Sequence, residues 1–448
     1  MNEFCDAPRW RCIVERMRAY FVATLAILVA CGGNSTGDDD DDGIDGGTQV
    51  TVTLTNQPTD AAQVSFIAAY QDGDGAWMLA PAPSGNTYSF SVAGATYSFA
   101  WTCIASGPLL GAAQIRQVQI ARFAVSERPN LSLTLPPRCA GLAGTVPLTG
   151  TVSNLGTSGN FFVTFGDRFG IVNPNTGAFM MMTPPGTHDL LVLRMQSGVG
   201  PGERVVDRAF IQRGLAVSGA TTANVDFSTS MATMAYPVTI TDTGRIGAMT
   251  TLFTPGGTEA GLVQLYTTPY ESRALASAQA MAGDLYEQEM SVNANGQTAT
   301  TTLTTTAPAA QTWTAPPPLG GVIATIASAA PYAQVSSMWP AYANAVGYSW
   351  QASQQLTMAQ CGGNTGCVVL WQALVSPGAA GASPMFTMPD LSALAGWSAT
   401  LQPIAGVEIT GFAQAVTSSA GAADFPPATP PADGTQRTVV RSDYTVMP

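Results

Sequence analysis

The one histidine of the chain is the first residue to examine for chemistry. His188 stands in the segment PPGTHDLLVL and is followed directly by Asp189. A Ser-His-Asp or Cys-His arrangement would have to use this imidazole. Successive side chains of a strand point to opposite faces, so His188 and Asp189 would be directed apart. We therefore expect a polar residue at the start of a strand, and we assign no catalytic residue.

Paired carboxylates are a second source of chemistry. Glycoside hydrolysis uses two carboxyl groups about 5–10 Å apart in a cleft, and Asp207, Glu259 and Asp284 are the places to look for such a pair. Residues 290–389 contain no Asp, Glu, Lys, Arg or His, so general acid–base chemistry cannot arise within that stretch. We predict a protein that is not an enzyme and keep a hydrolase with an unrecognised carboxylate pair as an alternative.

Charged residues and methionines gather in the middle of the chain. Six charged residues lie close together in sequence: Arg194, Glu203, Arg204, Asp207, Arg208 and Arg213. We expect solvated strand faces there, and these residues are also the best candidates for contact with a polar partner.

Met180, Met181 and Met182 could offer thioethers to a soft metal. Consecutive strand residues cannot converge on one ion, so we expect packing instead.

Two acidic segments suggest calcium. Residues 38–42 are five aspartates followed by Gly43, which matches the first half of an EF-hand loop, but the twelfth position is Gln49 and not glutamate. Mutual repulsion and neighbouring glycines favour a flexible tether over residues 31–47. Asp72-Gly73-Asp74-Gly75 fits a hairpin turn equally well. We assign no metal site and no cofactor.

Composition excludes several classes of function. The chain of 448 residues has a formal charge of −12, only 10% of its residues are charged, and all 17 basic residues are arginine. Nucleic-acid binding needs clustered cations, so we expect no nucleic-acid partner. Schiff-base chemistry and a P-loop both need lysine and are excluded.

The seven cysteines divide by position. Cys5, Cys12 and Cys31 lie at the amino terminus, and four remain: Cys103, Cys139, Cys361 and Cys367. An even number in an exported protein favours two disulfides. The short loop between Cys361 and Cys367 suits one, which leaves Cys103 to pair with Cys139. A zinc site is disfavoured because the two distant pairs lack CxxC spacing and a helper histidine.

The amino terminus has the pattern of an export signal. Arginines precede an apolar run from Phe21 to Ala30, which is too short to span a bilayer but has the length of a signal-peptide core. The run ends in LVAC, which resembles the lipobox of bacterial lipoproteins. The resemblance implies removal of residues 1–30 and acylation of Cys31, with Met17 as an alternative start. The protein would then be held on a membrane without a spanning helix.

The rest of the chain has the pattern of strands. From Thr48 onward apolar and polar residues alternate, and Gly, Pro, Asn or Asp interrupt the pattern every eight to twelve residues. This is typical of β-sandwiches. We predict an all-β fold of several tandem Ig-like or transthyretin-like sandwiches after the signal peptide and acidic tether. The predicted domains span residues 48–139, 140–232, 233–314 and 315–448, with one helix in the third over residues 271–290, whose Arg273, Asp284, Glu287 and Glu289 would face outward.

Two segments resemble known β-sandwich families. Gly150-Thr151-Val152, Phe162 to Phe165, Thr176-Gly177-x-Phe179, Pro185-Gly186-Thr187 and Leu190-x-Val192 resemble the carboxypeptidase regulatory-like or transthyretin-like domain. That resemblance implies an accessory module without catalytic residues of its own. The segment WPAYANAVGYSWQASQQ resembles a strand pair of fibronectin type III domains.

These observations favour a lipid-anchored protein of the bacterial cell envelope, outside the cytoplasm at the outer membrane or cell surface, with a binding or structural role. A polysaccharide or an envelope protein is the partner that we consider. The alternative is a carbohydrate-binding or adhesive protein, because the last domain holds Trp339, Trp350, Trp371 and Trp397. An exposed row of these rings would favour sugar binding, whereas burial would favour a core.

Overall fold

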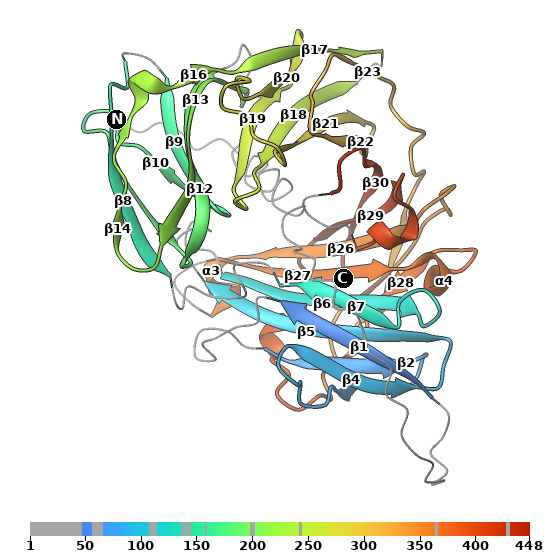
Figure 1. The fold of residues 1–448 in the computed structure, drawn as a ribbon. Helices are drawn as coiled ribbons and strands as arrows, with labels where there is room; N and C mark the ends of the chain where they lie inside the picture. Colours follow the sequence, from blue (N-terminus) through green and yellow to red (C-terminus); the bar gives the residue numbers. More distant parts are fainter. Residues whose placement is uncertain are drawn as a thin grey trace, which may run out of the picture.

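The structure is a computed structural model that describes residues 47–55, 66–106, 114–135, 139, 145–156, 159–197, 202–241, 244–362, 366–426 and 431–448. It is nearly all β, which confirms the predicted fold class. Four β-sandwich units follow one another along the chain (Figure 1). No helix in the described residues is long and apolar enough to cross a membrane.

The first two units contain sixteen strands. Unit 1 comprises β1 (Thr48–Thr55), β2 (Ala68–Asp72), β3 (Met78–Leu79), β4 (Thr87–Val92), β5 (Thr96–Ser106), β6 (Gln114–Ala124) and β7 (Asn130–Thr134). Unit 2 comprises β8 (Val146–Ser153), β9 (Asn160–Phe165), β10 (Arg168–Ile171), β11 (Ala178–Thr183), β12 (Gly186–Ser197), β13 (Arg204–Val217), β14 (Thr221–Thr222), β15 (Val225–Asp226), the 3-10 turn η3 (Phe227–Thr229) and β16 (Met231–Ala232).

The last two units contain the other fourteen. Unit 3 comprises β17 (Met234–Ile240), β18 (Arg245–Phe253), β19 (Glu259–Leu265), β20 (Tyr270–Ala274), β21 (Leu285–Ala294), β22 (Gln297–Thr305) and β23 (Gln311–Trp313). Unit 4 comprises β24 (Ile323–Ser328), β25 (Gln334–Met338), β26 (Gly347–Leu356), α3 (Met358–Cys361), β27 (Cys367–Val375), α4 (Pro377–Ala380), β28 (Met385–Thr387), η4 (Ala399–Leu401), β29 (Ile409–Ser418), η5 (Gly421–Asp424) and β30 (Gln436–Val446).

The first three units share one topology. In unit 1 the first strand, β1, pairs antiparallel with the fourth strand, β4, and parallel with the seventh strand, β7. The second strand pairs with the third and fifth, and the fifth pairs with the sixth. Units 2 and 3 repeat every one of these pairings, with β14 and β15 together as the seventh strand of unit 2. Each unit is thus a small sheet packed on a larger one.

Unit 4 departs from this topology at one position. Its six strands β25 to β30 repeat the four pairings that the first six strands of unit 1 make with one another. The place of the seventh strand beside β25 is taken by β24, which precedes β25 in sequence and pairs with it antiparallel. The small sheet of unit 4 is therefore completed by a strand that precedes the other six, whereas in units 1 to 3 it is completed by a strand that follows them.

The larger sheets of the four units join into one continuous sheet. Unit 1 meets unit 4 where β6 pairs parallel with β27, unit 4 meets unit 3 where β30 pairs with β22, and unit 3 meets unit 2 where β19 pairs with β13. The order across it is β3-β2-β5-β6-β27-β26-β29-β30-β22-β21-β18-β19-β13-β12-β9-β10. Backbone hydrogen bonds cross every joint, so the four units form one joined structure and are not independent domains connected only by linkers.

The cores show why the units associate in pairs. The larger sheet of unit 1 covers its own core with one face, while Val118 and Ile120 of the other face belong to the core of unit 4. Unit 2 behaves in the same way, because Leu191 and Leu193 pack into the core of unit 3. Units 1 and 4 lie together in the lower part of Figure 1, and units 2 and 3 lie above them.

Local features of unit 2 explain its turn residues. Gly177 has a φ of 71°, a left-handed conformation that favours glycine, at the turn that leads into β11. Gly150 lies on β8 where a Cβ would meet the Phe179 ring at 2.6 Å. Both glycines belong to the segment that resembles the carboxypeptidase regulatory-like domain, and both are required by the backbone or by packing.

The predicted helix over residues 271–290 is wrong. This segment forms β20, a series of turns and the first part of β21. Helical spacing of apolar residues was misleading because Leu275 and Tyr286 lie in the core and turns separate them. Asp284 and Glu287 were expected to face outward, yet their exposed fractions are 2% and 5%.

Both predicted disulfides are confirmed. Cys103 on β5 bonds to Cys139, and both residues are buried in the core of unit 1. Cys361 of α3 bonds to Cys367 at the start of β27 and closes a short loop. On a chain-entropy model these links contribute about 3–4 and about 2 kcal/mol respectively to the free energy of unfolding.

Candidate functional site

His188 and Asp189 have different hydrogen-bond partners, and the register of β12 with β13 is irregular between His188 and Leu190. The Nδ1 atom of His188 lies 2.8 Å from the Gly256 carbonyl oxygen, and the imidazole packs edge-on against Phe165. Asp189 is buried and accepts a hydrogen bond from the Gly214 N–H at 2.8 Å. His188 thus bonds unit 2 to the loop between β18 and β19, whereas Asp189 bonds to β13 within unit 2.

Arg213 links units 2 and 3 through two buried carboxylates. Its guanidinium donates to Asp189 at 2.9 Å and to both oxygens of Asp284 at 2.8 and 2.7 Å, and also to the Gln279 carbonyl at 3.0 Å. Burial alone would raise the pKa of Asp189, but hydrogen bonds from Gly214 and Arg213 outweigh it and leave the pKa below its usual value. A paired carboxylate that stays ionised fits a structural link.

Other charged residues of unit 2 are also engaged within the molecule. Arg194 forms a two-point contact with Asp207, at 2.9 and 2.5 Å. Arg208 donates to Ser230. Glu203, which is 3% exposed, accepts hydrogen bonds from the Tyr266 and Thr267 N–H groups. The expectation of solvated faces is wrong for Glu203, because the join between β13 and β19 buries it.

A cluster of carboxyl groups lies at the joint between units 3 and 4. Glu287 and Glu289 stand two residues apart on the same face of β21, and β22 continues this face to Arg437 on β30. Burial, together with the neighbouring Glu289, raises the pKa of Glu287 to about 7. Burial and Glu287 likewise raise the pKa of Glu259 to about 7. One carboxylate oxygen of Glu287 is buried and has no hydrogen-bond partner among the described residues.

The three carboxylates named from the sequence do not form one site. Asp207 pairs with Arg194, and Asp284 pairs with Arg213. Glu259 has Glu287 and Asp167 as its acidic neighbours. No group of three or more histidines, cysteines or carboxylates able to hold a metal ion occurs in the described part of the chain.

Amide side chains cross the joint between units 1 and 4. Gln372 on β27 accepts hydrogen bonds from Gln117 at 2.7 Å and Gln119 at 3.0 Å, both on β6, and donates to Gln351 on β26 at 3.0 Å. On the same face of the sheet, the Arg441 guanidinium lies 3.8 Å above the Phe412 ring centre. We call Gln117, Gln119, Gln351 and Gln372 the amide row; its side chains are polar and uncharged.

The tryptophans of unit 4 belong to its core. Trp339, Trp350 and Trp371 are 2%, 1% and 1% exposed, and the Trp371 Nε1–H donates to the Leu401 carbonyl at 2.9 Å. Trp397 is half-buried and packs against Tyr332 and Trp371. The rings do not form an exposed row, so they provide no stacking platform for sugars.

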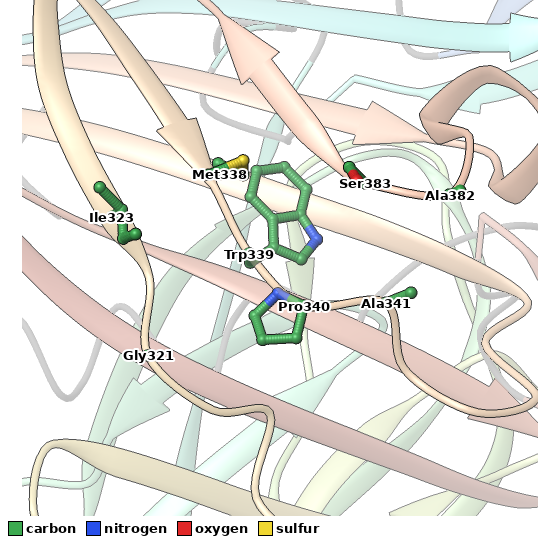
Figure 2. A pocket seen from close by; sticks show the side chains of 8 residues that line it. All are labelled: Gly321, Ile323, Met338, Trp339, Pro340, Ala341, Ala382 and Ser383. Carbon is green, nitrogen blue, oxygen red and sulfur yellow. The ribbon is translucent and has the colours of Figure 1, made fainter.

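One pocket lies beside the small sheet of unit 4 (Figure 2). Its volume is about 270 Å³, and its lining comprises Gly321, Ile323, Met338, Trp339, Pro340, Ala341, Ala382 and Ser383. In Figure 2 the Trp339 indole stands among these residues, with its nitrogen edge turned toward Ala341 and Ala382. The lining side chains are apolar apart from Ser383, and the Trp339 indole nitrogen is itself buried.

The methionines and the acidic turn singled out in the sequence do not converge on a metal site in the described residues. Met181 is in the core of unit 2, whereas Met180 and Met182 are 69% and 41% exposed, so the three sulfurs do not converge. Asp72 to Gly75 form the turn between β2 and β3, and Asp74 pairs with Arg122. Cys31 and the aspartates of residues 38–42 lie outside the described residues.

Comparisons with known proteins give little. No family model and no curated protein matches the chain. Among solved structures, a DUF3823 family protein from Bacteroides ovatus ATCC 8483, a bacterial β-rich domain, is 16% identical over 34% of this chain and 91% of its own. Its TM-score is 0.13, which is too low to support a conclusion about this chain.

Sequence reasoning missed both the Arg213 link and the pocket. Arg213, Asp189 and Asp284 are spread over about a hundred residues, and only the pairing of β13 with β12 and β19 brings them together. The pocket needs β24 to take the place of a seventh strand. Neither feature leaves a local motif, although the absence of charge over residues 290–389 marks the region in which the pocket lies.

Proposed function

We propose that the protein is a lipid-anchored protein of the bacterial cell envelope with a binding or structural role, acylated at Cys31 after removal of the preceding residues. Two disulfides support this proposal, because such bonds persist in oxidising compartments outside the cytoplasm. They use all four later cysteines and leave Cys31, at the end of the apolar run, for the anchor.

The joined sheet supports a binding or structural role rather than catalysis. Several of its polar side chains, such as Arg213 and Gln372, form hydrogen bonds that link one unit to another. A continuous sheet with a packed core in every unit is a scaffold that can present surface loops and pockets to a partner. The buried tryptophans do not favour the alternative of a sugar-stacking surface.

The anchor is tested by mass spectrometry of the amino-terminal peptide from the native host. We expect a peptide that begins at Cys31 and carries acyl chains, and a protein that fractionates with membranes. Cys31→Ser releases the protein from membranes, whereas Cys12→Ser leaves its fractionation unchanged. An unmodified and uncleaved amino terminus, or free thiols at the four later cysteines, would contradict the proposal.

The binding role is tested with a soluble form that lacks residues 1–47. This form is offered to immobilised polysaccharides and to envelope extract in parallel. Retention of one envelope component, saturable and competed by the free protein, supports a binding role. Retention on polysaccharide alone would replace it with the carbohydrate-binding alternative.

A further inference from the structure

Methionine is distributed differently from the other large apolar residues of this protein. Methionine side chains are usually buried, yet ten of the fifteen methionines in the described residues are at least 37% exposed. All other large apolar residues of the described chain contribute four exposed side chains: Leu79, Phe169, Ile171 and Ile323. The ten exposed methionines are Met78 in unit 1, Met180, Met182 and Met231 in unit 2, Met234 and Met281 in unit 3, and Met338, Met358, Met385 and Met447 in unit 4.

The exposed methionines stand outside the cores. None of these ten side chains belongs to a buried cluster, whereas Met181, Met290 and Met388 are core residues of units 2, 3 and 4. On β11, Met180 and Met182 point outward on either side of the buried Met181. Oxidation to sulfoxide makes a methionine side chain polar. At an outward position the added oxygen would lie in solvent, whereas at Met181 it would disrupt the core.

Other side chains that oxidants attack are covered or already oxidised. All four cysteines of the described residues form disulfides. Every tryptophan and tyrosine in the described part of the chain is buried or half-buried. Thiols and thioethers are the side chains that hypochlorous acid and peroxides oxidise most readily. Methionine sulfur is therefore the main reactive group that the described surface presents to such oxidants.

The spread of the exposed methionines distinguishes them from a docking surface. A docking surface gathers apolar residues in one patch, whereas these residues occur in all four units. Two of them accept weak hydrogen bonds, from the Tyr70 hydroxyl to the Met78 sulfur at 3.9 Å and from the Tyr236 hydroxyl to the Met234 sulfur at 4.0 Å. A thioether is a weak acceptor and a sulfoxide oxygen a stronger one, so both hydroxyl groups keep an acceptor after oxidation.

We propose that the exposed methionines are a renewable sink for two-electron oxidants, namely hypochlorous acid and peroxides. This inference goes beyond the proposed binding or structural role. The sink consumes oxidant at positions where sulfoxide leaves the fold intact, and so spares the cores of this protein and the methionines of its neighbours.

The reaction is a transfer of one oxygen atom to sulfur. The sulfur lone pair attacks the chlorine of hypochlorous acid and the Cl–O bond breaks, after which water forms the S–O bond and displaces chloride. Sulfur loses two electrons, and the net products are sulfoxide, chloride and one proton. With a peroxide, sulfur attacks one oxygen and the O–O bond breaks, which releases water or an alcohol. A methionine sulfoxide reductase reverses the change with a dithiol, which becomes a disulfide while the oxygen leaves as water.

The first test titrates the purified full chain with hypochlorous acid and maps each oxidised residue by peptide mass spectrometry. We expect about ten equivalents to be consumed at the exposed methionines. Met181, Met290 and Met388 should be oxidised at least about tenfold more slowly, because their sulfurs are buried. The midpoint of thermal unfolding should stay unchanged until the ten sites are oxidised. Methionine sulfoxide reductases with dithiothreitol should then restore the original mass.

The second test measures protection of another molecule. A reporter peptide with one methionine is mixed with an equal concentration of the protein and with less than one equivalent of hypochlorous acid. If all exposed thioethers react alike, the peptide competes with ten sulfurs and takes about one oxidant molecule in eleven. Met→Leu at all ten exposed positions keeps the surface apolar, and we expect it to raise the share taken by the peptide about tenfold.

Matched variants separate exposure from methionine content. Met181→Leu, Met290→Leu and Met388→Leu together remove three buried thioethers and should leave the share taken by the peptide unchanged. A smaller variant keeps the test decisive if the tenfold variant does not fold. Met→Leu at Met180, Met182, Met338 and Met385 should raise that share from about one in eleven to about one in seven, because six exposed sulfurs remain.

Several outcomes would overturn the sink. It is wrong if Met181 is oxidised as fast as Met180, if tryptophan or tyrosine reacts before the exposed methionines, or if the protein does not protect the peptide. In the native host, cells that carry Met→Leu at the ten positions should accumulate more sulfoxide in other envelope proteins after exposure to hypochlorous acid, and an equal amount would also overturn it. Failure of acylation at Cys31 would contradict the envelope anchor and leave the competition with the peptide unchanged.

Discussion

The pair of units 1 and 4 and the pair of units 2 and 3 use the same architecture with different chemistry. In both pairs the larger sheet of the earlier unit is covered on both faces and joins the later unit edge to edge. The first joint is long, with β6 and β27 paired over nine residues, whereas β13 and β19 pair at only two positions. Side-chain amides form hydrogen bonds across the long joint, whereas ion pairs link the two units beside the short one.

The difference shows what each joint needs. A long ladder and a large apolar core hold units 1 and 4 together, and the charged residues Arg116, Arg128 and Glu127 of unit 1 form hydrogen bonds with backbone groups of unit 4 rather than ion pairs with its side chains. The short ladder between units 2 and 3 leaves polar atoms of the loops to be satisfied by Arg213, Asp189 and Asp284. Ion pairs are costly to bury but costly to break once buried. The two pairs should therefore respond differently to mutation, salt and pH.

The largest effect is expected in the apolar pair. Trp371→Ala removes a ring that is 1% exposed and packed against Tyr332 and Trp397. We expect a loss of about 4 kcal/mol in the free energy of unfolding, measured by denaturant titration. The loss should be the same in low and high salt because no charge is involved. A strong dependence on salt would contradict a purely apolar core.

The ionic pair should respond to loss of its arginine. Arg213→Met leaves Asp189 and Asp284 buried without their partner, and we expect a loss of about 3 kcal/mol at pH 8. Arg194→Met, at the half-exposed pair with Asp207, should cost less than about 1 kcal/mol. Adding Asp189→Asn and Asp284→Asn to Arg213→Met should recover much of the loss. If it does not, packing of the long side chain rather than charge holds the joint.

The pH dependence of the ionic pair has a definite sign. The folded-state pKa of Asp189 is lowered, so its stabilisation is present above the ordinary pKa and is lost as pH falls through the lowered value. In Arg213→Met the buried Asp189 carboxylate loses its cationic partner and is protonated more readily, so lowering the pH from 8 to 5 should reduce the difference in stability between the variant and the wild type. A difference that stays constant with pH would contradict this assignment.

The sequence allows the general architecture to be predicted but not the joints. Alternation of apolar residues and the cysteine positions correctly predict an all-β sandwich protein with two disulfides. The helix over residues 271–290 was wrong because apolar spacing does not distinguish a helix from strands separated by turns. Arg213 and Gln372 find their partners only through pairing of distant strands, which no local pattern encodes.

The third joint, between units 3 and 4, should make the free energy of unfolding depend on pH. Burial raises the pKa of Glu287 from its usual value of 4.5 to about 7. Between these values the folded protein binds more protons than the unfolded one, so stability should rise as pH falls from 8 to 5. Glu287→Gln should raise stability at pH 8 by about 1–3 kcal/mol and reduce that rise. Equal stability of the two proteins at pH 8 would contradict burial of this charge.

The smallest effect is expected in the amide row of the first joint. Gln372→Leu removes an acceptor that Gln117 and Gln119 share and a donor to Gln351. Neutral hydrogen bonds contribute about 1 kcal/mol each, and the new apolar side chain compensates part of the loss, so we expect about 1 kcal/mol with no dependence on pH or salt. Gln414→Leu on the same face serves as the control and should change little. If Gln372→Leu cost as much as Arg213→Met, the amide row would be as important to its joint as the ion pairs are to theirs. Neutral and charged links would then differ only in their response to pH.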